Sequence, residues 1–170
     1  KGLYESIEAV ALLRDAGIPV RLEIAGNGPD EAGLRSRAAA LGLQEEVVFR
    51  GAVFGADKDR LWLQADVLVF PTYHREGLPY ALLEAMACGC IVIASDNASI
   101  SAVIDSGYNG YIVPAGDVDA LAEKLATVIE HRNEWPAVGA AAKKTIQEKF
   151  AIDRYLADLE SIYDRAGAKR

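Results

Sequence analysis

Two glutamates, Glu76 and Glu84, are the residues of this chain whose type and spacing could do chemistry on a bound ligand. They lie eight positions apart, and Glu84 is the only charged residue between Gly77 and Ser95. We expect its carboxylate to be mostly desolvated, which costs free energy unless the group is hydrogen-bonded. A ligand hydroxyl could supply that hydrogen bond, and so could an arginine or the backbone of a neighbouring loop. The spacing alone leaves the functional and the structural interpretation open.

The elements around these glutamates are predicted to be a strand, a polar loop, a helix and a second strand. The apolar run 67–70, closed by a proline, is typical of a strand that is buried on both faces. Leu78 and Pro79 open the helix, and a further apolar run at 91–94 forms the next strand. The free N–H groups and the macrodipole at the start of such a helix favour anions. An anionic ligand held there could reach both glutamates.

Strands and helices alternate along the whole sequence, as the apolar periodicity and the glycine and proline positions indicate. This alternation predicts one α/β domain over residues 1–170, a Rossmann-like, doubly wound parallel sheet with helices on both faces and further helices at the C-terminus. The predicted helices cover 3–16, 30–41, 57–65 (capped by Asp57), 78–88, 99–105, 117–130, 133–150 and 152–165, and the predicted strands cover 20–25, 47–49, 67–70, 91–94 and 111–113.

The chain begins directly on a helix, without the strand that precedes it in a doubly wound sheet. In the usual strand order this first strand is central and lies next to the switch point where ligands bind. A sheet that lacks it would have unpaired backbone groups in its core. We therefore expect the first strand to lie before residue 1 and the chain to be a segment of a longer protein.

Composition argues against several classes of function. A formal net charge of −7 and a pI near 4.9 disfavour nucleic acid as a partner and a polybasic membrane patch. Cys88 and Cys90 are too close for an unstrained disulfide, and no signal peptide or long apolar run is present, so we expect a cytoplasmic protein. His74 and His131 lack companions at metal-ligand spacing, and there is no G-x-S-x-G elbow. We expect neither a metal site nor a nucleophilic triad.

Several motifs follow one another along the chain: Lys1-Gly2, G-N-G-P at 26–29, V-V-F-R-G at 47–51, A-D-V-L-V-F-P-T at 65–72, E-G-L-P-Y-A-L-L-E-A-M-A-C-G at 76–89 and G-x-x-G at 107–110. Their order resembles the C-terminal, donor-binding domain of retaining GT-B glycosyltransferases, in particular family 4 (glycosyl transferases group 1). The resemblance covers essentially the whole chain. Its most specific part is the E-x7-E spacing of Glu76 and Glu84, whereas a glycine turn alone is weak.

The resemblance implies a role for each matching residue. Lys1 matches a lysine that holds the donor diphosphate together with an arginine, which would lie before residue 1. Glu76 matches the catalytic glutamate that lies against the donor sugar; there it would orient the sugar and stabilise positive charge at the anomeric carbon. Glu84 matches the glutamate that accepts hydrogen bonds from the ribose. The other implied contacts are Gly77, Leu78 and Pro79 with the sugar hydroxyls and diphosphate, and Gly28, Val53 and Phe54 with the base and its ribose.

The resemblance also implies the reaction, which is transfer of a hexose or N-acetylhexosamine from a nucleoside-diphosphate sugar with retention of configuration. No metal or other cofactor would be needed, because a lysine and helix N–H groups would stabilise the leaving diphosphate. The loop H-R-E-G-L-P-Y at 74–80 is similar to that of enzymes that build bacterial surface polysaccharides, which favours a UDP-sugar as donor.

An N-terminal acceptor-binding domain of the same protein is the implied partner, and any membrane contact would run through that half. The last helix, with Phe150, Tyr155 and Tyr163, resembles the tail that crosses back to that domain, so its aromatic residues would be partly exposed here. This segment alone would bind the donor weakly and catalyse nothing. Two alternatives stay open: a sugar-nucleotide epimerase of GT-B type, and a non-catalytic nucleotide-binding module.

Overall fold

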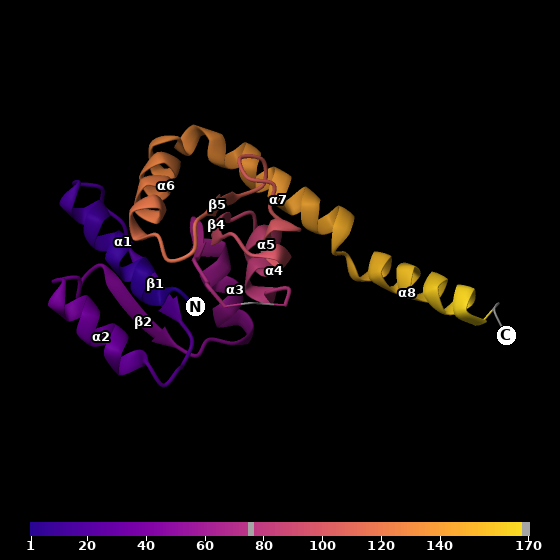
Figure 1. Cartoon of the computed structure of the whole chain (residues 1–170), viewed down its shortest axis with the longest axis horizontal. Coiled ribbons are helices and arrows are strands. Elements are labelled where there is room, and N and C mark those ends of the chain that lie inside the picture. The colour runs from indigo at the N-terminus through magenta and orange to yellow at the C-terminus, as the bar shows by residue number, and fades with distance from the viewer. Residues whose placement is uncertain (75–76, 168–170) are drawn as a thin grey trace.

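The computed structural model describes residues 1–74 and 77–167, in which strands and helices alternate as expected (Figure 1). The strands are β1 (Leu22–Ala25), β2 (Val47–Gly51), β3 (Val67–Phe70), β4 (Ile91–Ser95) and β5 (Tyr111–Val113). The helices are α1 (Leu3–Asp15), α2 (Glu31–Ala40), α3 (Gly55–Gln64), α4 (Tyr80–Cys88), α5 (Ala98–Ser101), α6 (Val118–Glu130), the 3-10 turn η1 (Arg132–Glu134), α7 (Trp135–Lys149) and α8 (Ile152–Gly167). The predicted α/β fold is confirmed.

All the strand pairs are parallel, and the strands form two hydrogen-bonded groups. β1 pairs with β2, while β4 pairs with β3 on one side and β5 on the other. Within the described residues no ladder joins β1 to β3. β3 therefore has a ladder on one edge only, and all four of its residues are half-buried. Both faces of β3 are nevertheless covered, as predicted. Val67 and Val69 pack against one core, and Leu68 and Phe70 pack against the other.

Helix α1 connects the two groups of strands because it has apolar residues on two sides. Ile7 and Val10 pack with β1 and α2, while Ala9 and Leu13 pack with β4, β5 and α6. Ile7 and Ala9 are fully buried. Burying a side chain the size of Ile7 is favourable by roughly 1.5–3 kcal/mol before the entropy cost of ordering it. α1 thus holds β1 and β2 against the three-stranded group.

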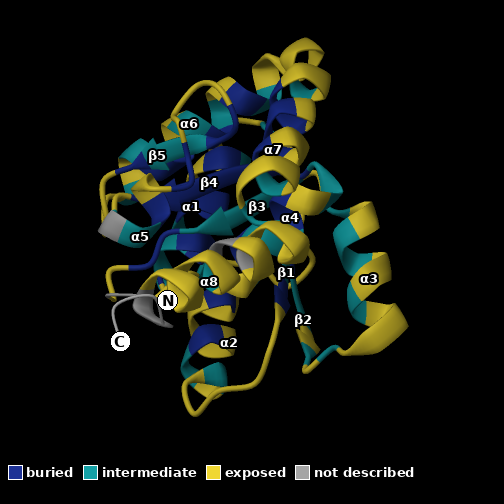
Figure 2. Cartoon of the chain, turned by 90° about the vertical axis from the view of Figure 1, so that its right-hand side faces the viewer, coloured by how far each residue is buried: buried dark blue, intermediate teal, exposed yellow. Residues whose placement is uncertain are grey.

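The three-stranded group is covered by helices on both faces, and β4 is its centre. Ile91 and Ile93 belong to the core shared with α1 and α6, whereas Val92 and Ala94 belong to the core shared with α4 and α5. This alternation follows from the two-residue period of a strand. Every residue of β4 is buried, as in the dark blue strand of Figure 2. Such burial on both faces is typical of a parallel sheet.

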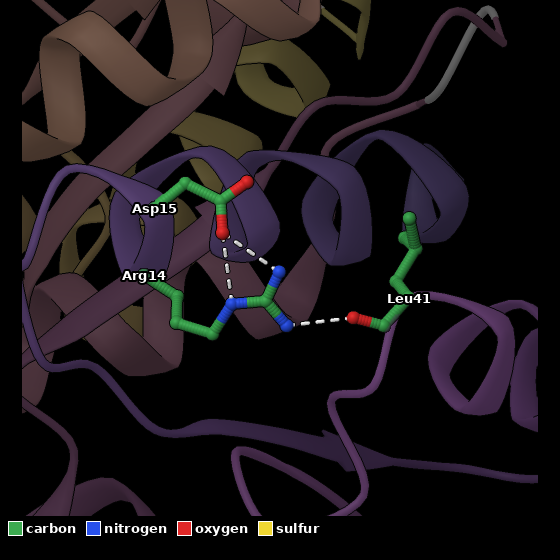
Figure 3. Close-up of polar contacts among 3 residues, drawn as sticks. All are labelled: Arg14, Asp15 and Leu41. Atoms are coloured by element: carbon green, nitrogen blue, oxygen red, sulfur yellow. Dashed lines mark hydrogen bonds and ion pairs between the residues drawn. The ribbon is translucent and has the colours of Figure 1, made fainter.

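A surface contact joins the ends of α1 and α2. The Nη1 of Arg14 donates a hydrogen bond of 2.6 Å to the carbonyl oxygen of Leu41, the residue that ends α2 (Figure 3). The Nε and Nη2 of Arg14 donate to Oδ1 of Asp15 at 3.0 and 2.8 Å. The carbonyl groups of the last turn of a helix lack hydrogen-bond donors within the helix, and Arg14 donates to the one at Leu41.

Two helices differ from the sequence-based predictions. Helix α3 begins at Gly55 with Phe54 as its N-cap residue, and the side chain of Asp57 bonds to Arg60 instead of capping the helix. Helix α5 covers only four residues. Both differences concern loops after strands, where a polar side chain has several competing partners.

Helix α8 extends away from the rest of the molecule in Figure 1. Four of its apolar residues are between 48% and 68% exposed: Ile152, Leu156, Ile162 and Tyr163. Tyr155 lies among side chains outside the described set, and Phe150 is half-buried before α8 begins. Among the described helices, α8 included, none is both long and apolar enough to cross a membrane.

Candidate functional site

Lys1 lies at the carboxyl end of β3, where the chain packs tightly. The Lys1 ammonium is 5.6 Å from the centre of the Phe70 ring. Gly2 follows with a φ of 73°, and a Cβ on it would lie 2.1 Å from the carbonyl oxygen of Pro71. Only glycine accepts both this backbone conformation and this approach. The buried Gly2 therefore holds the exposed Lys1 at the edge where parallel α/β sheets bind ligands.

The loop after β3 is fixed at His74 by two residues that the sequence analysis did not single out. The His74 N–H donates to Oγ1 of Thr72 at 3.3 Å, and the Asn97 Nδ2 donates to the His74 carbonyl oxygen at 2.8 Å. Asn97 also caps α5 by accepting from the N–H of Ser99. Thr72 is fully buried. The loops that follow β3 and β4 are thus tied together at the carboxyl edge of the sheet.

Glu76, the predicted catalytic residue, lies outside the described residues, as does Arg75. The structure resumes at Gly77, and Leu78 is 39% exposed. Pro79 is the N-cap residue of α4, with extended backbone, so its missing N–H leaves no helical hydrogen bond unmade. The helix then starts at Tyr80 and ends at Cys88, and the C-cap residue Gly89 is left-handed with a φ of 82°. The predicted bounds of this helix are confirmed to within two residues.

Glu84 is hydrogen-bonded, but it is less buried than predicted. Its side chain is 38% exposed, because it points to the side of α4 that faces α3 and not into the core. The Lys58 ammonium lies 2.7 Å from Oε1 and the Trp62 indole Nε1 donates to Oε2 at 3.2 Å. The partner is a lysine, not the arginine considered from the sequence. Its hydrogen bond to Glu84 is the largest cause of a raised pKa for Lys58, and it favours the charged form of the lysine.

The residues predicted to lie near the base follow β1 and β2, whose ends are joined. The N–H of Gly26 donates to the carbonyl oxygen of Gly51 at 2.7 Å, which brings the Gly28 loop beside the end of β2. Gly28 is exposed, with open space around the position of a Cβ. Val53 is half-buried and Phe54 is 77% exposed. An aromatic ring this exposed after a parallel strand offers a flat apolar surface to a ligand.

Helix α3 connects these two parts of the site. It begins directly after Phe54, and its Lys58 and Trp62 hold Glu84 on α4. The described residues contain no cluster of three or more His, Cys, Asp or Glu residues that could hold a metal ion.

Known proteins that are similar to this chain identify its family. The family profile described as Glycosyl transferases group 1 matches residues 1–145. This chain belongs to the glycosyl transferases group 1 family. A relative within the curated proteins is the amylovoran biosynthesis glycosyltransferase AmsK of Erwinia amylovora, which is 31% identical over 155 residues, or 88% of this chain and 38% of AmsK. The chain spans about two fifths of the length of the curated relatives that it matches first.

Solved structures of glycosyltransferases share the fold. The C-terminal domain of the group 1 glycosyl transferase LpcC from Francisella tularensis has a TM-score of 0.77 and 26% identity, over 89% of this chain and 80% of that one. Anabaena HepE in complex with UDP-glucose has a TM-score of 0.78 and 25% identity, over 92% of this chain and 44% of that one. The predicted resemblance to a GT-B domain of this glycosyltransferase family is confirmed. Two of the curated relatives, AmsK and the CapM of Staphylococcus aureus, are named for polysaccharide biosynthesis.

Proposed function

We propose that this chain is the donor-binding domain of a retaining glycosyltransferase. It would bind a UDP-activated hexose or N-acetylhexosamine, which the full-length protein transfers to an acceptor during synthesis of a bacterial polysaccharide or glycoconjugate. The observation that carries the proposal is the placement of Glu84 and Lys1. Glu84 lies in the second turn of α4 with its carboxylate partly open to solvent, and Lys1 lies at the end of β3, the strand before α4.

The residue types suit a leaving group that gains negative charge. As the bond from the sugar to the diphosphate breaks, charge develops on the phosphate oxygens. The Lys1 ammonium and the free N–H groups at the start of α4 are positive groups that could lie near such a charge. We propose that they take the place of a metal ion. Glu76, which follows the tied loop in sequence, would orient the sugar and stabilise positive charge at its anomeric carbon.

The nucleoside half of the donor would lie on the other side of the site. Glu84 would accept hydrogen bonds from the ribose hydroxyls, and Gly28, Val53 and Phe54 would border the base. The HepE structures support nucleotide-sugar binding by this fold, because HepE shares it and was solved in complex with UDP and with UDP-glucose. The reaction that we propose takes place in the cytoplasm and involves no nucleic acid.

The acceptor would be held by an N-terminal domain of the same protein. Two observations support that partner: the chain covers about two fifths of its curated relatives, and the exposed apolar residues of α8 form a surface that another domain could cover. Any membrane contact would run through that domain.

The reaction is tested by incubating the full-length protein with UDP-glucose or UDP-N-acetylglucosamine, with and without a polysaccharide-repeat acceptor, in the presence of a chelator. We expect UDP release that depends on acceptor, and nuclear magnetic resonance should show a product with the anomeric configuration of the donor. Inversion of configuration, or loss of activity with the chelator, would contradict the retaining, metal-free mechanism. Conversion of the UDP-sugar without acceptor would instead indicate an epimerase.

A further inference from the structure

The carboxylate of Glu84 is held from the neighbouring helix by two donors. Lys58 lies 2.7 Å from one carboxylate oxygen, and the Trp62 indole donates to the other at 3.2 Å. Lys58 and Trp62 are four positions apart and so lie on one face of α3. They are the side chains that donate to Glu84 among residues 1–74 and 77–167. A carboxylate oxygen can accept two hydrogen bonds, so each oxygen keeps capacity for one more.

This contact contributes little to the stability of the fold. The side chains of Lys58 and Glu84 are each 38% exposed, and exposed ion pairs are worth little because water screens them. Helix α3 has no buried residue. The half-buried ring of Trp62 packs against the core, and the backbone carbonyl oxygen of Trp62 accepts a hydrogen bond of 3.3 Å from Cys90 Sγ. The two donors therefore have a geometric consequence: they fix the orientation of a carboxylate on a flexible side chain.

We propose that Lys58 and Trp62 are positioning residues that hold Glu84 to accept both hydroxyls of the donor's ribose, and that they thereby select ribonucleotides over deoxyribonucleotides. The inference rests on the proposed function. Two adjacent hydroxyls can each donate to one oxygen of a carboxylate that is already oriented. Because Lys58 and Trp62 fix that orientation before the ligand arrives, the ligand does not bear the entropy cost of ordering the Glu84 side chain.

A second arrangement of the same residues makes the opposite prediction. If Lys58 occupied Glu84 only in the absence of ligand, the nucleotide would have to displace it, and removal of Lys58 would tighten binding. The sign of the change in affinity therefore separates the two.

The test is calorimetric titration of UDP and of 2′,3′-dideoxyuridine diphosphate into the full-length protein and its variants. Lys58→Met removes the ammonium, Trp62→Phe removes the indole N–H but keeps a ring, and Lys58→Arg keeps the charge. Arg60→Met is the matched control, because Arg60 lies on the same helix and bonds to Asp57.

We expect Lys58→Met and Trp62→Phe to weaken UDP binding about tenfold each, the size of one charge-assisted hydrogen bond. Their affinity for the dideoxy nucleotide should equal that of the wild type, as should the affinity of Arg60→Met for both ligands.

Partial rescue by Lys58→Arg supports positioning, since a guanidinium can also donate to Glu84. Equal losses for UDP and the dideoxy nucleotide would overturn the inference and assign the pair a purely structural role. Unchanged or tighter binding of UDP by Lys58→Met would overturn it as well. In each of these cases the wild type still binds UDP, so the proposed function stands. A wild type that binds no nucleotide overturns the proposed function together with this inference.

Discussion

Gly2 and Pro71 approach each other so closely that no side chain fits between them. A Cβ on Gly2 would lie 2.1 Å from the carbonyl oxygen of Pro71, and the φ of Gly2 is 73°. This contact fixes the start of α1 against the end of β3, and with it the position of Lys1. Because the obstacle is backbone, a small rotation of a side chain cannot relieve it.

Gly2→Ala should therefore destabilise the fold by at least about 2 kcal/mol, since left-handed strain and overpacking add. Urea unfolding measures the change. Gly17→Ala is a suitable control, because Gly17 has a similar φ of 75° but nothing within 4 Å of the Cβ position. We expect the control to lose only the strain, about 1 kcal/mol. Equal losses in the two variants would show that the Pro71 contact carries no free energy.

Asn97 is expected to matter for the site more than for the fold. Asn97→Ser keeps an oxygen that can cap α5 but removes the Nδ2 donor that holds the His74 carbonyl oxygen at 2.8 Å. We expect a loss of about 1 kcal/mol in the free energy of unfolding, the typical net value of one hydrogen bond. Turnover by the full-length enzyme should fall by more than about fivefold, the factor that corresponds to this loss of free energy. The reason is that the loop that leads to Glu76 would no longer be fixed. Thermal unfolding and steady-state kinetics on the same preparation compare the two effects.

The buried thiol of Cys90 should make stability depend on alkaline pH. Burial raises the pKa of Cys90 from an ordinary value of 9.0 to about 11, and Sγ donates to the carbonyl oxygens of Trp62 and Ala65. The unfolded thiol ionises above about pH 9, while the folded thiol keeps its proton until about pH 11. The unfolded state then binds fewer protons, so the contribution of Cys90 to stability is present below pH 9 and is lost as the pH rises towards 11. The contribution of Cys90 is measured by comparing the unfolding free energies of wild type and Cys90→Ala at pH 8 and at pH 10.5. If the two proteins lost the same free energy between these pH values, the burial of this thiol would be contradicted.

The elements of this fold could be predicted because their signals are local. The apolar run of β3 and the Pro79 and Gly89 that bound α4 each specify a structure within a few residues. The α/β class then follows from alternation, since parallel strands need crossover helices.

The contacts of Glu84 could not be predicted, because they depend on how α3 and α4 pack. Lys58 and Trp62 lie 26 and 22 residues from Glu84, and their spacing on α3 is compatible with many partners. The solvent exposure of Glu84 was misjudged for the same reason: an apolar sequence around a residue does not say which side of the helix faces the core. Asn97 was missed because a short polar loop gives no signal of which backbone group it will bind.

Glu76 is predicted to act on turnover more than on donor binding. In the full-length enzyme, Glu76→Ala should lower kcat by a much larger factor than it raises the donor Kd, because stabilisation of charge at the anomeric carbon exists only in the transition state. Equal factors in kcat and in donor affinity would make Glu76 a binding residue. Steady-state kinetics with saturating acceptor, combined with equilibrium donor binding, separate the two.

The most direct test of the donor-binding assignment is calorimetric titration of UDP, GDP and ADP, and then of their hexose conjugates, into the full-length protein and its Glu84→Gln variant. We predict selective binding of one nucleotide, UDP, and a loss of about 1–3 kcal/mol in the variant, because the ribose hydroxyls would lose a charged acceptor. Binding of none of the nucleotides, or equal affinity of wild type and Glu84→Gln, would contradict the placement of the donor on Glu84.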